Sequence, residues 1–163
     1  MFYRLRLFLA FLIMAIWSGC DDNNDSPIPL YPVSLKLNLT STYPTFKNST
    51  NQFLLFEKRI NVNDMIGYGG ILVCTGVSLD DSGNTIYYAF DMACPYEVKR
   101  DVRVYPVKDG LGQVKCEKCG SVYNIGYGSG YPEPNSGPAA GPAVKKLRRY
   151  NTSLSNDDLY IYR

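Results

Sequence analysis

The residues of this chain best suited to chemistry are cysteines in its second half, and the chain contains no histidine. Two short motifs carry them, Cys94-Pro95-Tyr96 and Cys116-Glu117-Lys118-Cys119, with 19 residues between Tyr96 and Cys116. Thiolates bind soft metal ions and iron–sulfur clusters, and paired thiols form disulfides. Cys94, Cys116 and Cys119 are therefore candidates for thiol chemistry.

The segments around these motifs have the pattern of short β-strands. Residues 33–39 alternate apolar and polar side chains, which buries one face of a strand. Apolar runs at 69–74 and 86–90 flank a stretch of Asp, Ser, Gly and Asn, which predicts a hairpin. No segment has a helical period over ten residues, so we expect an all-β antiparallel protein. Further strands are expected at 52–56, 102–105, 113–115, 147–150 and 159–162, and residues 126–141 are expected to be loop.

The N-terminal residues have the features of an export signal. Arg4 and Arg6 precede an apolar run at 7–17, shorter than the roughly 20 residues that span a bilayer, so residues 1–19 are interpreted as a signal peptide. The Cys20 that follows Ser18-Gly19 resembles a bacterial lipobox, which implies a lipid anchor on Cys20. Residues 20–32, with three Pro, are expected to form a flexible tether, and residues 33–163 the β domain.

The charge balance restricts the partners of the mature chain. Removal of residues 1–19 takes away two Arg and no acidic residue, which leaves 15 basic and 15 acidic side chains. A net charge of zero argues against nucleic acid and against electrostatic docking on anionic lipid. Attachment to the membrane would then rest on acyl chains at Cys20. Asp21, Asp22 and Asp25 resemble the surface-export signals of Bacteroidetes lipoproteins. The implied location is the outer membrane of a Gram-negative bacterium, on its periplasmic or cell-surface face.

The cysteine motifs, in this order and between these strands, resemble the two loops of Rieske iron–sulfur domains. Residues 89–95 are similar to the strand and first cluster loop of that family, and residues 119–123 to its second loop and the strand that leaves it. Residues 141–143, with Leu147 and Tyr150, are similar to the segment that closes over the cluster. The resemblance implies a Rieske-like antiparallel β sandwich or barrel with two cysteine-bearing loops. The chain also resembles histidine-poor Rieske-like lipoproteins of Bacteroidetes.

The ligand set departs from the Rieske pattern of Cys-x-His and Cys-x-x-His. The family binds a two-iron cluster with two Cys on one iron and two His on the other. Tyr96 occupies the first His position here and Cys119 the second. A phenol with a pKa near 10 is a poor ligand, so Tyr96 is interpreted as a degenerate ligand position. Cys74 is expected to be a buried strand residue away from the loop tips.

Several states of the thiols fit this pattern. The exported compartment is oxidising, and the resemblance implies that the two loops face each other. We therefore favour a disulfide from Cys94 to Cys116 or Cys119 and no bound cofactor. By loop entropy, closing roughly 20 residues stabilises a fold by about 3 kcal/mol. The alternatives are a [2Fe–2S] cluster or a zinc ion on Cys94, Cys116 and Cys119, free thiols, or a Cys116/Cys119 redox pair activated by Lys115 and Lys118.

These features favour a non-enzymatic binding or structural module, whose disulfide-stapled loops contact an unknown protein partner. The alternative is an electron-transfer protein with a cysteine-ligated metal centre. No catalytic residues are predicted, because serine triads need a His and no glycine-rich phosphate loop opens a helix. The basic residues at 145–149, interrupted by Leu147, are interpreted as an edge strand protected by charge.

Overall fold

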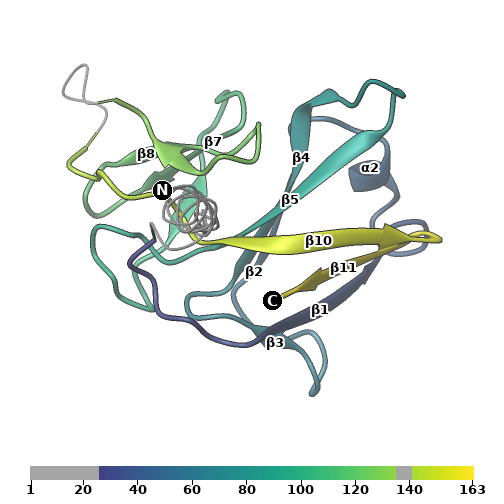
Figure 1. Cartoon of the computed structure of the whole chain (residues 1–163), viewed down its shortest axis with the longest axis horizontal. Helices are drawn as coiled ribbons and strands as arrows, with labels where there is room; N and C mark the ends of the chain where they lie inside the picture. Colours follow the sequence, from purple (N-terminus) through teal and green to yellow (C-terminus); the bar gives the residue numbers. More distant parts are fainter. Residues whose placement is uncertain (1–25, 135–140) are drawn as a thin grey trace, which may run out of the picture.

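The protein is all-β in the computed structural model, which describes residues 26–134 and 141–163 (Figure 1). Within these residues the single helix is α2 (Pro44–Lys47), and none is long and apolar enough to cross a membrane. A seven-stranded sheet has the order β2-β4-β5-β10-β11-β1-β3, and a four-stranded sheet the order β6-β7-β8-β9. The expected signal peptide and the residues Cys20, Asp21, Asp22 and Asp25 lie outside the described residues.

The strands of the large sheet follow the sequence pattern closely. β1 (Val33–Asn38) buries alternate side chains, as period two requires. β4 (Ile71–Leu79) and β5 (Thr85–Asp91) form the expected hairpin. β10 (Arg149–Ser155) and β11 (Asp158–Tyr162) form a second hairpin, with Asn156 and Asp157 at positive φ in its turn. The remaining strands are β2 (Phe53–Phe56) and β3 (Met65–Ile66).

The apolar runs of β4 and β5 do not alternate because both of their faces are buried. Ile71, Val73 and Ala89 belong to a core cluster enclosed by the large sheet. Leu72 and Phe90 point to the opposite face and belong to a second cluster, shared with the small sheet. A strand covered on both sides gains from apolar residues at every position. The β4–β5 hairpin therefore joins the two sheets.

The small sheet carries the second cysteine motif. It contains β6 (Val104–Pro106), β7 (Gln113–Cys116), β8 (Val122–Asn124) and β9 (Tyr131–Pro132). Val114, Cys116 and Tyr123 are fully buried in the second core cluster, which also contains Cys74 and Cys94. The cysteines of the two motifs are thus part of the core between the sheets.

Two expectations about the C-terminal half are wrong. Residues 126–141 are not all loop, because Tyr131 and Pro132 form β9 against β8. The basic residues at 145–149 do not form an edge strand, since 145–148 lie outside the strands and β10 has a hydrogen-bonded strand on each side, β5 and β11. Charge on an edge strand therefore does not explain this basic run.

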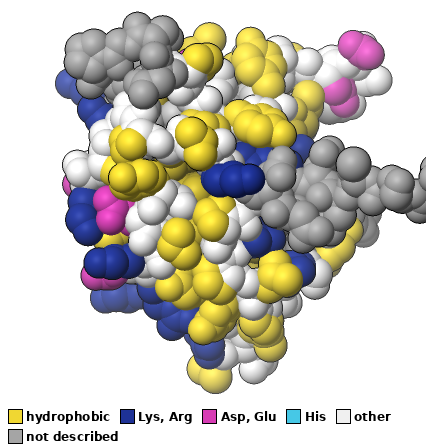
Figure 2. All heavy atoms as spheres, turned by 60° about the vertical axis from the view of Figure 1, so that its left-hand side comes forward, with side chains coloured by type: hydrophobic (Ala, Val, Ile, Leu, Met, Phe, Trp, Pro, Cys, Tyr) yellow, Lys and Arg dark blue, Asp and Glu magenta, His cyan; other side chains and the backbone are white. Residues whose placement is uncertain are grey.

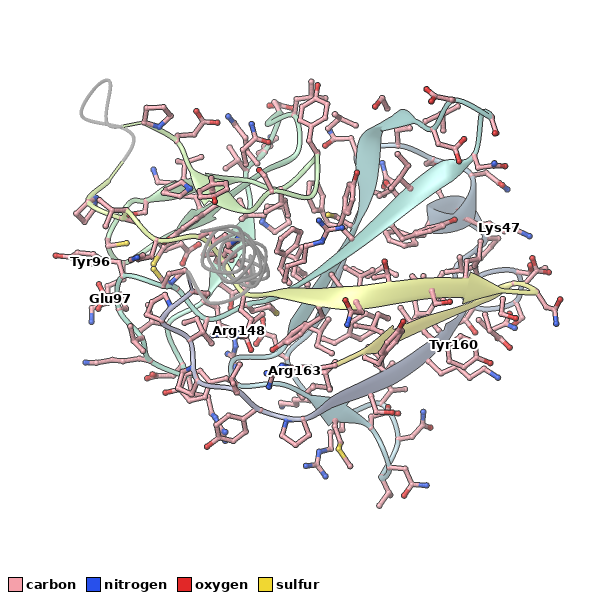
Figure 3. All side chains as sticks on the ribbon, in the orientation of Figure 1. Lys47, Tyr96, Glu97, Arg148, Tyr160 and Arg163 are labelled. Carbon is pink, nitrogen blue, oxygen red and sulfur yellow. The ribbon has the colours of Figure 1, made fainter. Side chains whose placement is uncertain are left out.

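The described part of the expected tether, residues 26–32, is anchored to the domain. Ile28 is buried, and the guanidinium of Arg148 donates hydrogen bonds to the carbonyl oxygens of Ile28 and Ser26, each at 2.8 Å. Arg148 is itself buried and lies immediately before β10 (Figure 3). The backbone carbonyls and the buried guanidinium satisfy each other's hydrogen-bonding capacity here. This segment therefore packs on the domain from Ser26 onward.

Candidate functional site

The first cysteine loop leaves the end of β5 and returns to β6. The N–H of Cys94 donates to the carbonyl of Val102 at 2.9 Å, and the N–H of Val98 donates to the carbonyl of Cys94 at 2.9 Å. A bridge between Ala93 and Arg103 closes the base of the loop. Val98 has φ 50, a left-handed conformation that is unusual for a β-branched residue. The surrounding hydrogen bonds hold the loop in this shape, with Cys94 pointing into the core.

The second cysteine loop is a tight turn between β7 and β8. The N–H of Cys116 donates to the carbonyl of Ser121, and the N–H of Gly120 donates to the carbonyl of Cys116, both at 2.9 Å. Gly120 has φ +75, which favours glycine, so its position in the turn has a local conformational reason. The turn places the side chains of Cys116 and Cys119 on the same side.

The two loops bring three thiols together. The Sγ atoms of Cys94, Cys116 and Cys119 all lie within 4.8 Å of one another, and those of Cys94 and Cys119 are 3.6 Å apart. Cys94 and Cys116 are fully buried, whereas Cys119 is partly exposed. Cys74 is buried in β4 and lies outside this cluster, where its Sγ is 3.9 Å from the carbonyl oxygen of Ile125. The site thus contains three of the four described cysteines.

Two hydroxyl groups contact the sulfur atoms. The Oγ of Ser121 lies 3.2 Å from the Sγ of Cys119 and accepts a hydrogen bond from the N–H of Ala143 at 3.1 Å. The hydroxyl of Tyr123 lies 3.5 Å from the Sγ of Cys94. In this contact the Cys119 thiol donates to the Ser121 oxygen, and once the thiol ionises the Ser121 hydroxyl can rotate its own proton toward the thiolate. Hydroxyl donors of this kind stabilise thiolates.

The environment separates the acidities of Cys116 and Cys119. Burial raises the pKa of Cys116 to about 12, against the opposing effect of hydrogen bonds from backbone N–H groups in the turn. Burial also acts to raise the pKa of Cys119, but hydrogen bonds from Ser121 and from the neighbouring thiols outweigh it and lower the pKa overall. Cys119 is therefore the thiol that ionises more readily, and it is also the more accessible of the two.

The lysines near the second loop are not the cause of this acidity. Lys118 forms an ion pair with Glu97 at 2.9 Å, which links the tips of the two loops across the solvent-exposed side of the site. Lys115 is exposed on β7. The contribution from Ser121 replaces the expected one from Lys115 and Lys118, because Lys115 is exposed to solvent and the charge of Lys118 is paired with Glu97.

Tyr96 does not join the thiols. It is 54% exposed and points outward from the domain beside Glu97 (Figure 3). Because the chain has no His, the two imidazole ligands of a Rieske cluster have no counterpart in it. The residues present therefore do not fit a Rieske [2Fe–2S] centre.

The expected disulfide is not present in the structure, where the described cysteines 74, 94, 116 and 119 are free thiols. A disulfide needs about 2.05 Å between sulfur atoms, compared with 3.6 Å between Cys94 and Cys119. Tetrahedral zinc with Zn–S bonds of about 2.3 Å separates its sulfurs by about 3.8 Å. The 3.6 Å between the Cys94 and Cys119 sulfurs is close to that value, and all three sulfurs lie within 4.8 Å of one another.

A buried carboxylate positions the first loop, and sequence reasoning missed it. Oδ1 of Asp91 accepts hydrogen bonds from the N–H groups of Gly69 and Ala93, at 2.9 and 2.8 Å. Oδ2 accepts from the N–H of Tyr68 at 2.8 Å and from the hydroxyl of Tyr150 at 2.6 Å. Asp91 thereby ties the strand that leads to Cys94 to β10 and to the loop before β4. The signal available in the sequence was an acidic residue at the end of an otherwise apolar strand.

Comparison of this chain with protein-family models, with curated proteins and with solved structures finds no match.

Proposed function

We propose that this protein is an exported, lipid-anchored domain with a Rieske-like fold, in which three thiolates hold a soft metal ion such as zinc. The observation that carries the proposal is the convergence of Cys94, Cys116 and Cys119, whose sulfur atoms all lie within 4.8 Å of one another. A disulfide would use two of them and leave the third without a partner in the cluster. Three ligands of one type around one point are what a metal ion requires.

The chain's own residues would contribute in three ways. Cys94, Cys116 and Cys119 would ligate the ion, and metal binding would offset the cost of ionising the buried Cys116 thiol. The hydroxyls of Ser121 and Tyr123 would hydrogen-bond to thiolate ligands and orient them. Zinc sites with three protein ligands leave a fourth position for water or another donor. The partial exposure of Cys119 is consistent with access to such a position.

The test is metal analysis of the full-length protein, purified without oxygen and in detergent. We expect about one zinc per chain and, after cobalt substitution, thiolate-to-cobalt absorption bands. Cys119→Ser should lower the metal content, and Cys74→Ala is the matched control because Cys74 is a cysteine outside the cluster. Iron with acid-labile sulfide would overturn the proposal in favour of an electron-transfer protein. So would a metal-free chain, or equal metal content in the two variants.

A binding module with disulfide-stapled loops is the second candidate. It is favoured by the 3.6 Å separation of the Cys94 and Cys119 sulfurs, from which a small side-chain movement would form a bond in an oxidising compartment. Tyr96 and Val98 expose hydrophobic surface on the first loop. Figure 2 turns this side of the molecule forward and shows hydrophobic side chains interspersed with charged ones, a surface suited to contact with a protein partner.

Mass spectrometry of the unreduced protein separates the two candidates. A Cys94–Cys119 cross-linked peptide in metal-free protein would support the stapled module, and alkylation of all three cysteines in that protein would exclude it. In either case the anchor at Cys20 would place the domain at a membrane surface.

A further inference from the structure

A cavity at the junction of the two sheets has a lining unlike the rest of the surface. It measures about 520 Å³ and lies where β9, the segment before β10, and the ends of β10 and β11 meet. The cations on its lining are Lys146 and Arg149, and no Asp or Glu occurs among its described lining residues. The charged groups on the described lining of this cavity are therefore all positive.

Lys146 is the unusual residue of this lining. Its side chain is buried, with the residue 7% exposed, yet none of the ion pairs within residues 26–134 and 141–163 includes it. Its ammonium lies 5.3 Å from the centre of the Tyr131 ring, and a cation–π contact compensates a buried charge in part. Charged groups that leave water are normally paired with an opposite charge. The described residues supply none to Lys146.

Arg149 presents a second cation to the same cavity. Its guanidinium stacks over Tyr88 at 5.0 Å and donates one hydrogen bond to the carbonyl of Gly128 at 3.0 Å. None of the ion pairs in the described ranges includes Arg149 either. A guanidinium has five N–H donors in a planar fork, so donors of Arg149 stay available to a ligand. Two cations therefore face one hollow whose described lining contains no carboxylate.

The rest of the lining indicates the size and shape of the ligand. Tyr131 and Tyr162 are 49% and 46% exposed, and both line the cavity. Half-exposed tyrosine rings pack against flat or ring-shaped molecules and hydrogen-bond at their edge. Ser129, Asn151 and Thr152 add polar groups. A volume of this size holds a small organic molecule and greatly exceeds that of a bare inorganic ion.

We propose that this cavity binds a small organic anion, with its carboxylate or phosphate group against Lys146 and Arg149 and its ring against Tyr131 and Tyr162. The site shares no residue with the thiol cluster, so the proposal stands independently of any metal on the cysteines. It also gives a physical reason for the basic run at 145–149. Arg148 of that run anchors the N-terminal segment, whereas Lys146 and Arg149 face the cavity.

The test uses three probes with the same sugar body, namely glucose, glucuronate and glucose 6-phosphate, titrated by calorimetry into the full-length chain in detergent. We expect at least one of the two anions to bind about tenfold or more tightly than glucose, and which one binds distinguishes carboxylate from phosphate. Lys146→Met keeps the apolar stem and removes the charge, so it should weaken that binding about tenfold or more. Lys145→Met is the matched control, because Lys145 is exposed and does not line the cavity.

The outcomes that would overturn the proposal are specific. Equal affinity for glucose and both anions would show that Lys146 and Arg149 do not contribute to binding. Equal affinity of the Lys146→Met and Lys145→Met variants for the anion would show that Lys146 does not bind it. If Lys146→Met does not fold, Arg149→Gln replaces it, because Arg149 is exposed and tolerates substitution. Unchanged anion binding in that variant would also refute the inference.

Discussion

Replacement of Asp91 by Asn tests the buried hydrogen bonds that position the first cysteine loop. The Asp91 carboxylate is fully buried and accepts four hydrogen bonds, at 2.6 to 2.9 Å, two on each oxygen. An Asn side chain keeps one of these oxygens and replaces the other with an NH₂ group. Two buried donors would then face this NH₂ group, which cannot accept a hydrogen bond from them. They would be either the N–H groups of Gly69 and Ala93 or the N–H of Tyr68 and the hydroxyl of Tyr150.

The magnitude follows from the number of groups left unsatisfied. Each buried donor without an acceptor costs about 1–3 kcal/mol, so two cost about 2–6 kcal/mol. Part of this is offset because Asn carries no charge, and burial already disfavours the ionised Asp91, whose pKa is raised. We therefore expect Asp91→Asn to lower the free energy of unfolding by about 2–4 kcal/mol, a large part of the stability of a small domain.

Urea denaturation followed by circular dichroism measures this difference. Asp81→Asn is the matched control, because Asp81 is an exposed turn residue, and it should change the free energy of unfolding by less than about 0.5 kcal/mol. If Asp91→Asn were as stable as Asp81→Asn, the four hydrogen bonds would not hold the loop, and the assignment of Asp91 as its positioning residue would be wrong.

Three further predictions concern pH, the second loop and the N-terminal segment. Because its pKa is raised, folded Asp91 keeps its proton at pH values where the unfolded chain has lost it. The stability advantage of wild type over Asp91→Asn should therefore shrink as pH rises from about 4 through the folded pKa. Denaturation curves of both proteins over this pH range measure the advantage, and an advantage that grows with pH contradicts the prediction. Gly120→Ala and Gly83→Ala should each cost about 1–2 kcal/mol, since both have positive φ and no atom within 4 Å of the added Cβ, but only Gly120→Ala should change alkylation rates of the site thiols. Arg148→Met removes the hydrogen bonds to Ser26 and Ile28 and should accelerate limited proteolysis within residues 26–32 several-fold, whereas an unchanged rate would show that apolar packing alone holds the segment.

The sequence predicted most strands because their signals are local. Alternation at 33–39 and the turn residues at 80–84 depend on neighbours in the chain, and β1 and the β4–β5 hairpin form as these signals indicate. β9 was missed because it has two residues among glycines and prolines, too short for any periodicity. The basic run was misread because an edge strand and a buried cation have the same residue types. Their difference lies in neighbours that are distant in the sequence.

The sequence indicated which cysteines belong to the candidate site, but the expected disulfide between them is not what the structure contains. Cys94, Cys116 and Cys119 were singled out by the resemblance of their motifs to the Rieske loops, and the fold brings these three sulfurs within 4.8 Å of one another. The role of Ser121 depends on its distance to Cys119 and on the Ala143 N–H, which is 22 residues away in the chain. No local pattern encodes such a contact.

The amino-acid sequence by itself therefore determined the class of structure and the atoms that could do chemistry: short antiparallel strands, two cysteine loops, and no imidazole anywhere in the chain. Only the tertiary structure decided that three thiols converge while Cys74 and Tyr96 stay apart, and that Lys146 is buried without a carboxylate among the described residues. The physical reason is the distance along the sequence over which each kind of interaction acts. Strand and turn preferences are set by neighbouring residues, whereas convergence, burial and charge pairing depend on how the two sheets pack over β4 and β5.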